Sequence, residues 1–392
     1  MTVPSVLVNT YLFKGEYFFD ILTKIYILFG WVIGMNRLPV IWNQKGCVKI
    51  ASYCYILVFN CCLLYSIFLC YPEKSKDVLI ILNVISYFIC HVCAIVFWKT
   101  LKSFYKELFK IDKKINFEYC TSFSCKINFI QCFCLIIATV VYNVISTIID
   151  GMVSLLPGII IVHINYILES HYYGHLFGIL ESRLILLRKL IILNYPTNRD
   201  NVHTYNEEFR NCKNESVNLH CKNCKMDIRK LMHLYSEIIK AYDLLNAATK
   251  WQLLMIVVTT FLTTLTITYR AVLHIIDSTY SWRSLIFEIG ITITVMLPLI
   301  VPCVFGERLQ TEVQLLRNSL YTRIHTNGFD KPTRSIANYF LALTEVRSLT
   351  FSVFRMFEMN LSMIFQLLRV LISYVVIILQ FQKVINVDDS NV

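Results

Sequence analysis

Residues 361–381 read LSMIFQLLRVLISYVVIILQF, an apolar run that is long enough to cross a bilayer once as a helix. Val376 and Ile377 lie on the same helical stripe as four polar residues of the run, which are Gln366, Arg369, Ser373 and Gln380. Charged and amide groups are costly at membrane depth, so this stripe faces something other than lipid. It either packs against polar partners inside a bundle or lines a water-filled pore, and the residues alone leave both interpretations open.

The composition is typical of a protein that crosses the membrane several times. Of the 392 residues, 56% are hydrophobic and only 16% are charged, and the mean hydropathy is +0.57. Soluble domains rarely combine these values. The apolar runs are about 20 residues long, which is the length that a spanning helix needs. We therefore predict an all-α membrane protein.

The apolar runs divide the chain into a short N-terminal segment, a transmembrane domain and a tail. Residues 1–47 are predicted to be cytosolic and to contain an amphipathic or re-entrant helix at 16–35, for which an additional span is the alternative. Residues 48–381 form the seven-helix domain, and residues 382–392 form an extracellular tail. The seven predicted spans are about 48–70, 77–98, 127–149, 155–180, 251–273, 284–305 and 361–381.

Helical spacing continues beyond several of these spans. After the second span, a basic amphipathic segment places five apolar residues on one face, which are Leu101, Phe104, Tyr105, Leu108 and Phe109. The fourth helix is predicted to run to about residue 193, longer than a membrane needs. Helical spacing also precedes the fifth span from residue 228, follows the sixth span through 307–324, and predicts a helix over 335–357. We expect these extensions on the cytosolic side.

The distribution of Lys and Arg predicts the orientation. The N-terminal segment and the loops after the second, fourth and sixth spans contain 31 of the 37 basic residues, whereas the other loops and the tail contain 5. Cytosolic loops are enriched in these residues, so we predict a cytosolic N-terminus and an extracellular C-terminus. A G-protein-coupled receptor has the opposite orientation. Secondary transporters usually show internal repeats, and none is visible in this sequence.

The last span carries a short motif. Ser373-Tyr374 is followed by five hydrophobic residues and then by Gln380-Phe381. This resembles the insect gustatory receptors, whose last helix carries Thr-Tyr, five hydrophobic residues and Gln-Phe; Ser replaces Thr here and keeps the hydroxyl. Residues 351–372 also resemble the segment that leads into that helix. Because length and topology agree too, the chain is similar to the insect chemoreceptor superfamily, in which odorant receptors follow the motif less closely.

The resemblance implies a ligand-gated, non-selective cation channel that assembles as a tetramer, alone or with other gustatory receptor subunits. The last helix of each subunit would line a central pore, and the cytosolic extensions would form an anchor between subunits. This favours the pore interpretation of the stripe. The expected pore and gate residues are Gln366, Arg369, Ser373, Tyr374, Val376, Ile377, Gln380 and Phe381. We expect a multi-pass location in the plasma membrane of sensory neurons, in contact with lipid.

Arg369 departs from what a simple cation pore would need. In a homotetramer it would place four guanidinium groups beside the cation pathway, which is electrostatically unfavourable. Three explanations stay open: the side chain reaches toward cytosolic water, it pairs with Glu358 or another acidic group, or the chain functions only beside different subunits.

The resemblance also implies a ligand pocket among the second to sixth helices in the outer half of the subunit. Polar residues predicted for that region are Asn83, Tyr87, Tyr142, Asn143, His163, Thr263, Thr266, Glu288 and Thr292. The alternative is structural, because intramembrane threonines often bond their own backbone and tyrosines near helix ends act as interface anchors. An aromatic pocket with few polar groups fits an amphiphilic plant compound of the bitter type better than a sugar.

Other chemistries find little support. Cys221-x-x-Cys224 lacks a second, well-spaced pair of metal ligands. There is no phosphate loop, nucleophile elbow or pair of catalytic acids, so we expect no enzyme activity and no cofactor or metal. The basic cytosolic face suits anionic lipid better than nucleic acid. The alternatives that remain are an odorant receptor subunit that requires a co-receptor, and a seven-helix transporter or metabotropic receptor without its own pore.

Overall fold

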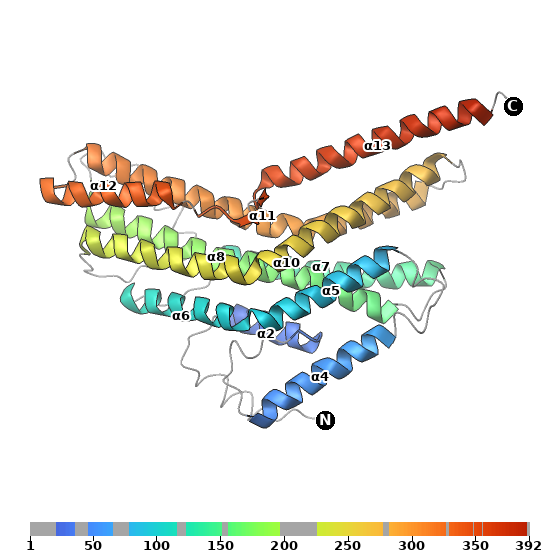
Figure 1. The fold of residues 1–392 in the computed structure, drawn as a ribbon, viewed down its shortest axis with the longest axis horizontal. Coiled ribbons are helices and arrows are strands. Elements are labelled where there is room, and N and C mark those ends of the chain that lie inside the picture. Colours follow the sequence, from blue (N-terminus) through green and yellow to red (C-terminus); the bar gives the residue numbers. More distant parts are fainter. Residues whose placement is uncertain are drawn as a thin grey trace.

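The computed structural model describes residues 21–35, 46–65, 78–115, 123–150, 156–196, 226–276, 282–326, 329–347, 349–354 and 356–389. These residues form an elongated bundle of helices (Figure 1), which confirms the all-α fold class. A helix occupies each stretch for which a span is predicted. These helices are α4 (Gly46–Leu64), α5 (Val78–Val96), α7 (Phe123–Asp150), α8 (Leu156–Asn194), α10 (Ile228–Ile276), α11 (Trp282–His325) and α13 (Leu361–Asp389).

Three further helices and a small hairpin complete the described part. They are α2 (Ile21–Val32), α6 (Trp98–Ile115), α12 (Lys331–Val346), and the strands β1 (Ser352–Val353) and β2 (Phe357–Glu358). Helix α2 lies in the predicted N-terminal segment and packs against α8. Tyr26 and Ile27 are buried there, and the Thr23 hydroxyl lies 2.9 Å from Nε2 of His175. Residues 1–20 and 36–45 lie outside the described residues.

Length and composition alone identify two helical segments in the described part as suited to crossing a membrane, Ile228–Tyr269 and Leu361–Gln380. Ile81–Val96 and Trp98–Ile115, which meet at a bend of 58°, make a third if they are one broken span. Shorter apolar helices cover Leu22–Val32, Ile50–Leu64 and Ile127–Val141. The boundaries of the seven spans and the sides that their ends face stay predictions.

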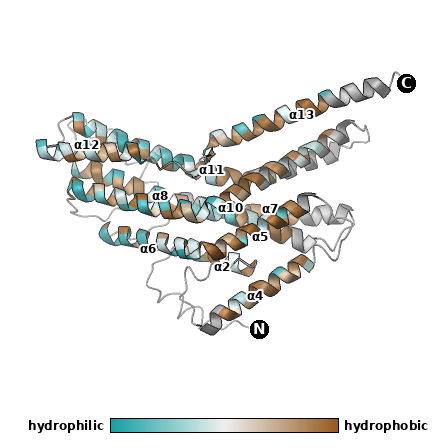
Figure 2. Ribbon diagram, in the orientation of Figure 1, coloured by the Kyte–Doolittle hydropathy of each residue, from teal (hydrophilic) through white to brown (hydrophobic). Residues whose placement is uncertain are grey.

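Helices α8, α10 and α11 contain 39, 49 and 44 residues. At about 1.5 Å per residue they are roughly twice as long as the hydrocarbon core is thick. The expected helical extensions are therefore present. They gather with α6 and α12 at one end of the bundle, where hydrophilic residues are frequent, whereas α4, α5 and α13 are mostly hydrophobic (Figure 2).

The extensions are held together by an apolar core. Leu231, Tyr235 and Ile238 recur at helical spacing on α10 and are buried. On α6 the buried face comprises Leu101, Phe104, Tyr105, Leu108, Ile111 and Ile115. Phe109, which the sequence predicts on this face, is instead 37% exposed. The face continues through Ile111 because a residue three positions after Leu108 returns to the same side of a helix.

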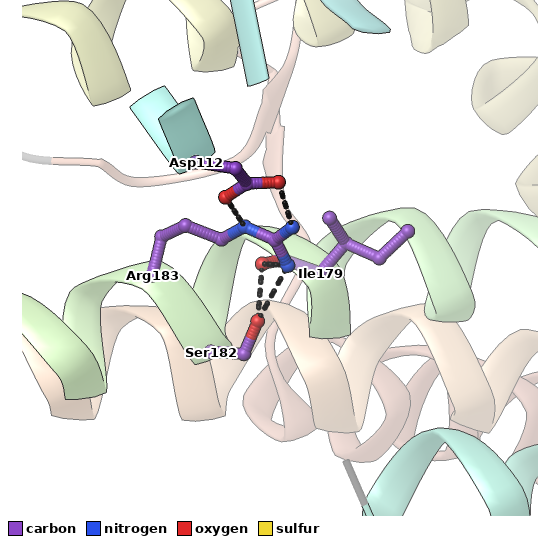
Figure 3. A network of polar contacts seen from close by, with 4 residues as sticks. All are labelled: Asp112, Ile179, Ser182 and Arg183. Carbon is purple, nitrogen blue, oxygen red and sulfur yellow. Dashed lines mark hydrogen bonds and ion pairs between the residues drawn. The ribbon is translucent and has the colours of Figure 1, made fainter. Parts of the chain in front are cut away.

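Ion pairs connect the extensions across this core. Arg183 on α8, with only 3% of its side chain exposed, binds Asp112 of α6 through Nε and one terminal nitrogen, at 3.1 and 2.7 Å (Figure 3). Its other terminal nitrogen donates to the carbonyl of Ile179 at 3.1 Å. Helices α8 and α11 are joined by two more pairs, Glu181 with Arg308 and Arg188 with Glu312. Among these, the Arg183–Asp112 pair is fork-shaped, which is the geometry that fixes the register between two helices best.

The prediction of a helix over 335–357 is wrong beyond Val346. A hairpin follows α12, with Ser352 opposite Glu358 and Phe354 at a φ of 54°. Tyrosines of α10 bind the backbone that leaves the helix, because the Tyr235 hydroxyl donates to the Arg347 carbonyl at 3.1 Å and Tyr242 donates to the Thr350 carbonyl.

Candidate functional site

A cavity with an empty volume of about 380 Å³ lies among α5, α7, α8, α10 and α11. Its lining is apolar and aromatic with a few polar groups, as is usual for small-molecule sites. The lining residues are Asn83, Thr139, His163, Tyr166, Ile167, Thr259, Thr260, Thr263, Val295 and Pro298.

A second cavity of about 290 Å³ adjoins the first between α5, α8 and α10. Asn83, Tyr166 and Thr259 line both, so the two form neighbouring chambers. The second chamber is the more polar. Its other lining residues are Ser86, Tyr87, Cys90, Val162, Asn165, Glu169 and Ile256.

Three polar atoms of the lining are buried and have no hydrogen-bond partner in the described part of the chain: Oγ1 of Thr259, Oγ1 of Thr263 and Oδ1 of Asn165. Leaving such an atom unsatisfied costs about 1–3 kcal/mol. Tyr166 contrasts with them, because its hydroxyl donates to the carbonyl of Ile256 at 3.1 Å and contacts the hydroxyl of Thr260. A bound molecule with hydrogen-bond donors would therefore gain most binding free energy by pairing with these three atoms.

The structure brings four of the predicted pocket residues to these chambers. Asn83, His163 and Thr263 line the first chamber, and Tyr87 lines the second. The Tyr87 hydroxyl is already engaged, since it donates to the carbonyl of Ile33 after α2 at 3.0 Å. Tyr87 therefore offers the chamber mainly its ring.

The other predicted pocket residues are placed differently. Thr266 is not among the lining residues, and its hydroxyl donates to the Leu262 carbonyl of its own helix at 2.9 Å, as the structural interpretation of such threonines expects. Thr292 does not line either chamber. The side chains of Tyr142, Asn143 and Glu288 lie outside the described part.

Sequence reasoning missed Thr139 on α7, and it interpreted Pro298 on α11 only as a source of a kink. Thr139 is a polar residue inside an apolar span, so the criterion that selected Tyr142 would also have found it. Glu169 belongs to the same group: it accepts a hydrogen bond from Tyr173 at 2.6 Å and lines the second chamber. Its burial depends on how α5 and α10 pack against α8, which one sequence does not reveal.

The last helix, α13, extends away from the bundle (Figure 1). Within its apolar stretch Leu361–Gln380, only 17% is buried in this chain. The polar stripe is exposed, namely Gln366, Arg369, Ser373 and Gln380. The apolar flanks are exposed too, with Phe365 at 69% and Ile372 at 65%. The side chain of Phe381 lies outside the described part.

Arg369 has no ion pair with Glu358, and its guanidinium has no hydrogen bond within the described residues. Its carbonyl accepts a bond from the Ser373 hydroxyl at 3.0 Å. Of the three explanations for this residue, pairing with an acidic group of the same chain therefore finds no support in the described part, whereas the other two stay open.

A long helical bundle with a cavity among its helices and one largely uncovered apolar helix is typical of a multi-pass membrane protein. The chain matches the family model described as 7tm Chemosensory receptor over residues 23–385. It therefore belongs to that family, and the resemblance to the insect chemoreceptor superfamily is confirmed.

Solved structures of similar fold include an insect olfactory receptor, OR5 from Machilis hrabei. The chain is 13% identical to it with a TM-score of 0.60, over 91% of this chain and 97% of that chain. A second structure of the same receptor is in complex with eugenol, with 12% identity and a TM-score of 0.61 over 92% and 97% of the two chains. At this identity the likeness concerns the fold alone. A search of curated proteins found no matching sequence.

Proposed function

We propose that this chemosensory receptor is a gustatory receptor subunit of a tetrameric, ligand-gated, non-selective cation channel. The observation that carries the proposal is α13, an apolar helix of membrane length that leaves a polar stripe uncovered in a single chain. Arg369 and the amides of Gln366 and Gln380 are costly in lipid. A water-filled pore between subunits removes that cost, and lipid and neighbouring subunits cover the apolar flanks.

The ligand we propose is a small amphiphilic plant compound of the bitter type. The two chambers are mostly apolar, and their unpartnered oxygens on Asn165, Thr259 and Thr263 suit a molecule with one or two donor groups. A sugar carries many hydroxyls, and an apolar lining would leave most of them unpaired. Eugenol, which is bound in the second olfactory receptor structure, combines an aromatic ring with one hydroxyl and is a reasonable first probe.

The choice of a gustatory over an odorant receptor rests on the motif of the last helix. Ser373-Tyr374 and Gln380-Phe381 keep the gustatory spacing with a single change. We propose that the protein is located in the plasma membrane of a sensory neuron. An odorant receptor subunit is the second candidate, because the structures of similar fold are olfactory receptors.

Recording from excised membrane patches tests the channel proposal. Patches lack cytosolic messengers, so a current evoked by eugenol or by another amphiphile from a plant-compound panel requires a pore in the receptor complex itself. Expression alone and together with candidate partner subunits separates a self-sufficient channel from one that needs a co-receptor. Responses that persist in whole cells but vanish in every patch would instead indicate a metabotropic receptor.

A further inference from the structure

The start of α13 is capped by two side chains, one from the residue directly before it and one from α11. The Asn360 side chain accepts a hydrogen bond from the backbone N–H of Met363 at 3.1 Å, as an N-terminal cap does. The backbone N–H of Leu361, the first residue of α13, donates to a carboxylate oxygen of Glu307 on α11 at 3.0 Å. A carboxylate at a helix N-terminus is also favoured by the helix dipole. An acidic side chain of α11 thus holds the first turn of the proposed pore helix.

The residues on either side of Glu307 are anchored as well. A Cβ added to Gly306 would meet the carbonyl oxygen of Met359 at 2.3 Å, so the chain before α13 lies directly on the backbone of α11. Arg308 forms the ion pair with Glu181 of α8 at 2.8 Å. Three successive residues of α11 therefore contact the hairpin, the start of α13 and α8.

The same helix reaches the ligand chambers. Val295 and Pro298 of α11 line the first chamber, and Glu307 follows Pro298 by nine residues, about 14 Å along the helix. Ser170 of α8 donates to the carbonyl of Pro298. One helix, interrupted in its backbone hydrogen bonding by Pro302, therefore connects the chamber with the Glu307 carboxylate.

A second route holds the hairpin to α10, which also lines both chambers. The rings of Trp251 and Phe354 lie 4.4 Å apart between their centroids, and the Tyr242 hydroxyl donates to the Thr350 carbonyl. These contacts hold the hairpin, whereas the Glu307 contact acts on α13 itself. The Glu307 hydrogen bond therefore joins α11 directly to the first turn of α13, a helix that α10 also contacts.

From this arrangement we infer that Glu307 is a positioning residue that couples the ligand chambers to the last helix, an inference that rests on the proposed channel function. Movement of α11 around a bound ligand shifts the carboxylate, and the first turn of α13 follows it. Without the carboxylate, the ligand still binds in the chambers, but α13 responds to it less.

Two measurements test this role in the full-length chain. The first is hydrogen–deuterium exchange of the backbone amides at 359–365 in protein held in lipid nanodiscs. Loss of a cap weakens the first turn, so Glu307→Ala should speed exchange there about fivefold or more. Glu307→Gln keeps an oxygen acceptor and should give an intermediate rate. Glu312→Gln is the matched control, because it neutralises an acid on the same helix whose partner is Arg188, and it should leave these amides unchanged.

The second measurement is the ratio of eugenol-evoked to spontaneous current, normalised to surface protein. Glu307→Ala should lower this ratio about fivefold or more, and Glu307→Gln should recover part of it. Gly306→Ala should also lower it, because the added methyl displaces Met359. Gly30→Ala serves as its control, since its Cβ would meet only ordinary contact with Met35 at 3.5 Å.

The outcomes separate the inference from the proposed function. Unchanged exchange in Glu307→Ala would show that the carboxylate does not cap α13. Faster exchange in Glu307→Ala together with an unchanged current ratio would show that the carboxylate only caps α13, and this result would overturn the coupling. A wild-type chain that forms no channel in any subunit combination would overturn the proposed function and the coupling with it, while the exchange rates would still report whether the contact exists.

Discussion

At the scale of single residues, the Arg183 guanidinium shows how a charge is accommodated among apolar helices. Taking a charge out of water costs several kcal/mol, and the attraction of one partner often fails to offset this. Arg183 offsets it with the fork-shaped pair to Asp112, the Ile179 carbonyl and the Ser182 hydroxyl (Figure 3). The pair thus ties α6, which packs mainly on α10, to α8.

Removing this guanidinium should destabilise the protein. Arg183→Met keeps most of the side-chain volume but leaves Asp112 without its partner, so the free energy of unfolding should fall by about 3 kcal/mol. Thermal unfolding in detergent, followed by the monodisperse fraction that remains, measures the change. Lys110→Met is the matched control on α6, because Lys110 forms an exposed pair with Glu107 and such pairs contribute at most about 1 kcal/mol. Equal melting temperatures for both variants would contradict the assignment.

Arg369 is the residue that most directly connects the stripe with ion selectivity. If it faces the pore, its charge repels cations, so Arg369→Gln should raise single-channel cation conductance and the preference for cations over anions. Recordings with asymmetric salt on the two sides of a patch measure both quantities. Conductance and selectivity that match those of the wild type would mean that Arg369 does not face the pore.

At the scale of elements, the chambers depend on which face α10 turns toward α8 and α5. Thr259 presents an unpartnered hydroxyl to both chambers, whereas Thr268 on the same helix donates to its own backbone at Thr264. The two residues have the same chemistry and differ in what their hydroxyls can bind.

We therefore expect Thr259→Val to raise the half-maximal concentration of an amphiphilic agonist with a donor group by about threefold to tenfold, the effect of losing one hydrogen bond. Thr268→Val should leave it within about twofold. Concentration–response curves of evoked current on the same expression background make the comparison. The chamber assignment fails if both variants shift the curve equally.

The features that could be predicted from the sequence are the helices, because these depend on the spacing of apolar residues. The apolar spacing from Ile228 to Tyr242 correctly predicts that α10 begins near residue 228, and the run to Leu193 correctly predicts where α8 ends. The hairpin at 349–359 was not predictable, because its residues are compatible with a helix. Tyr235, Tyr242 and the backbone of α11 around Gly306, all distant in sequence, hold it in place.

The candidate site was predictable only in part for a related reason. Polar residues inside apolar spans can be recognised from sequence, which is how Asn83, His163 and Thr263 were found. Whether such a residue faces a cavity or bonds its own backbone depends on how the helix is rotated. Thr263 lines the first chamber, whereas Thr266 bonds the backbone of its own helix. No sequence pattern indicates the role of Glu307. It lies at the end of a predicted span, and its partner is a backbone N–H, which every residue except proline has.

At the scale of the whole molecule, the hydrophilic end made by α6, α12 and the extended helices contrasts with the solitary apolar α13 (Figure 2). The extensions pack on one another through buried ion pairs and an apolar core, although some apolar side chains at this end, such as Tyr339 and Val346 of α12, stay exposed. Helix α13 has far less cover, because both its polar stripe and its apolar flanks are exposed. Helix α13, which we propose to form the pore, would therefore be covered only when subunits assemble.

Cysteine accessibility along α13 tests this claim most directly. Ser373→Cys lies on the stripe, and Ile378→Cys, five residues further on, lies about 140° around the helix from it. In patches with open channels, a charged, water-soluble thiol reagent should suppress the evoked current through Ser373→Cys and leave that through Ile378→Cys as in the wild type, whose native cysteines supply the background. Equal sensitivity of the two variants, or none in Ser373→Cys, would contradict a pore lined by this stripe.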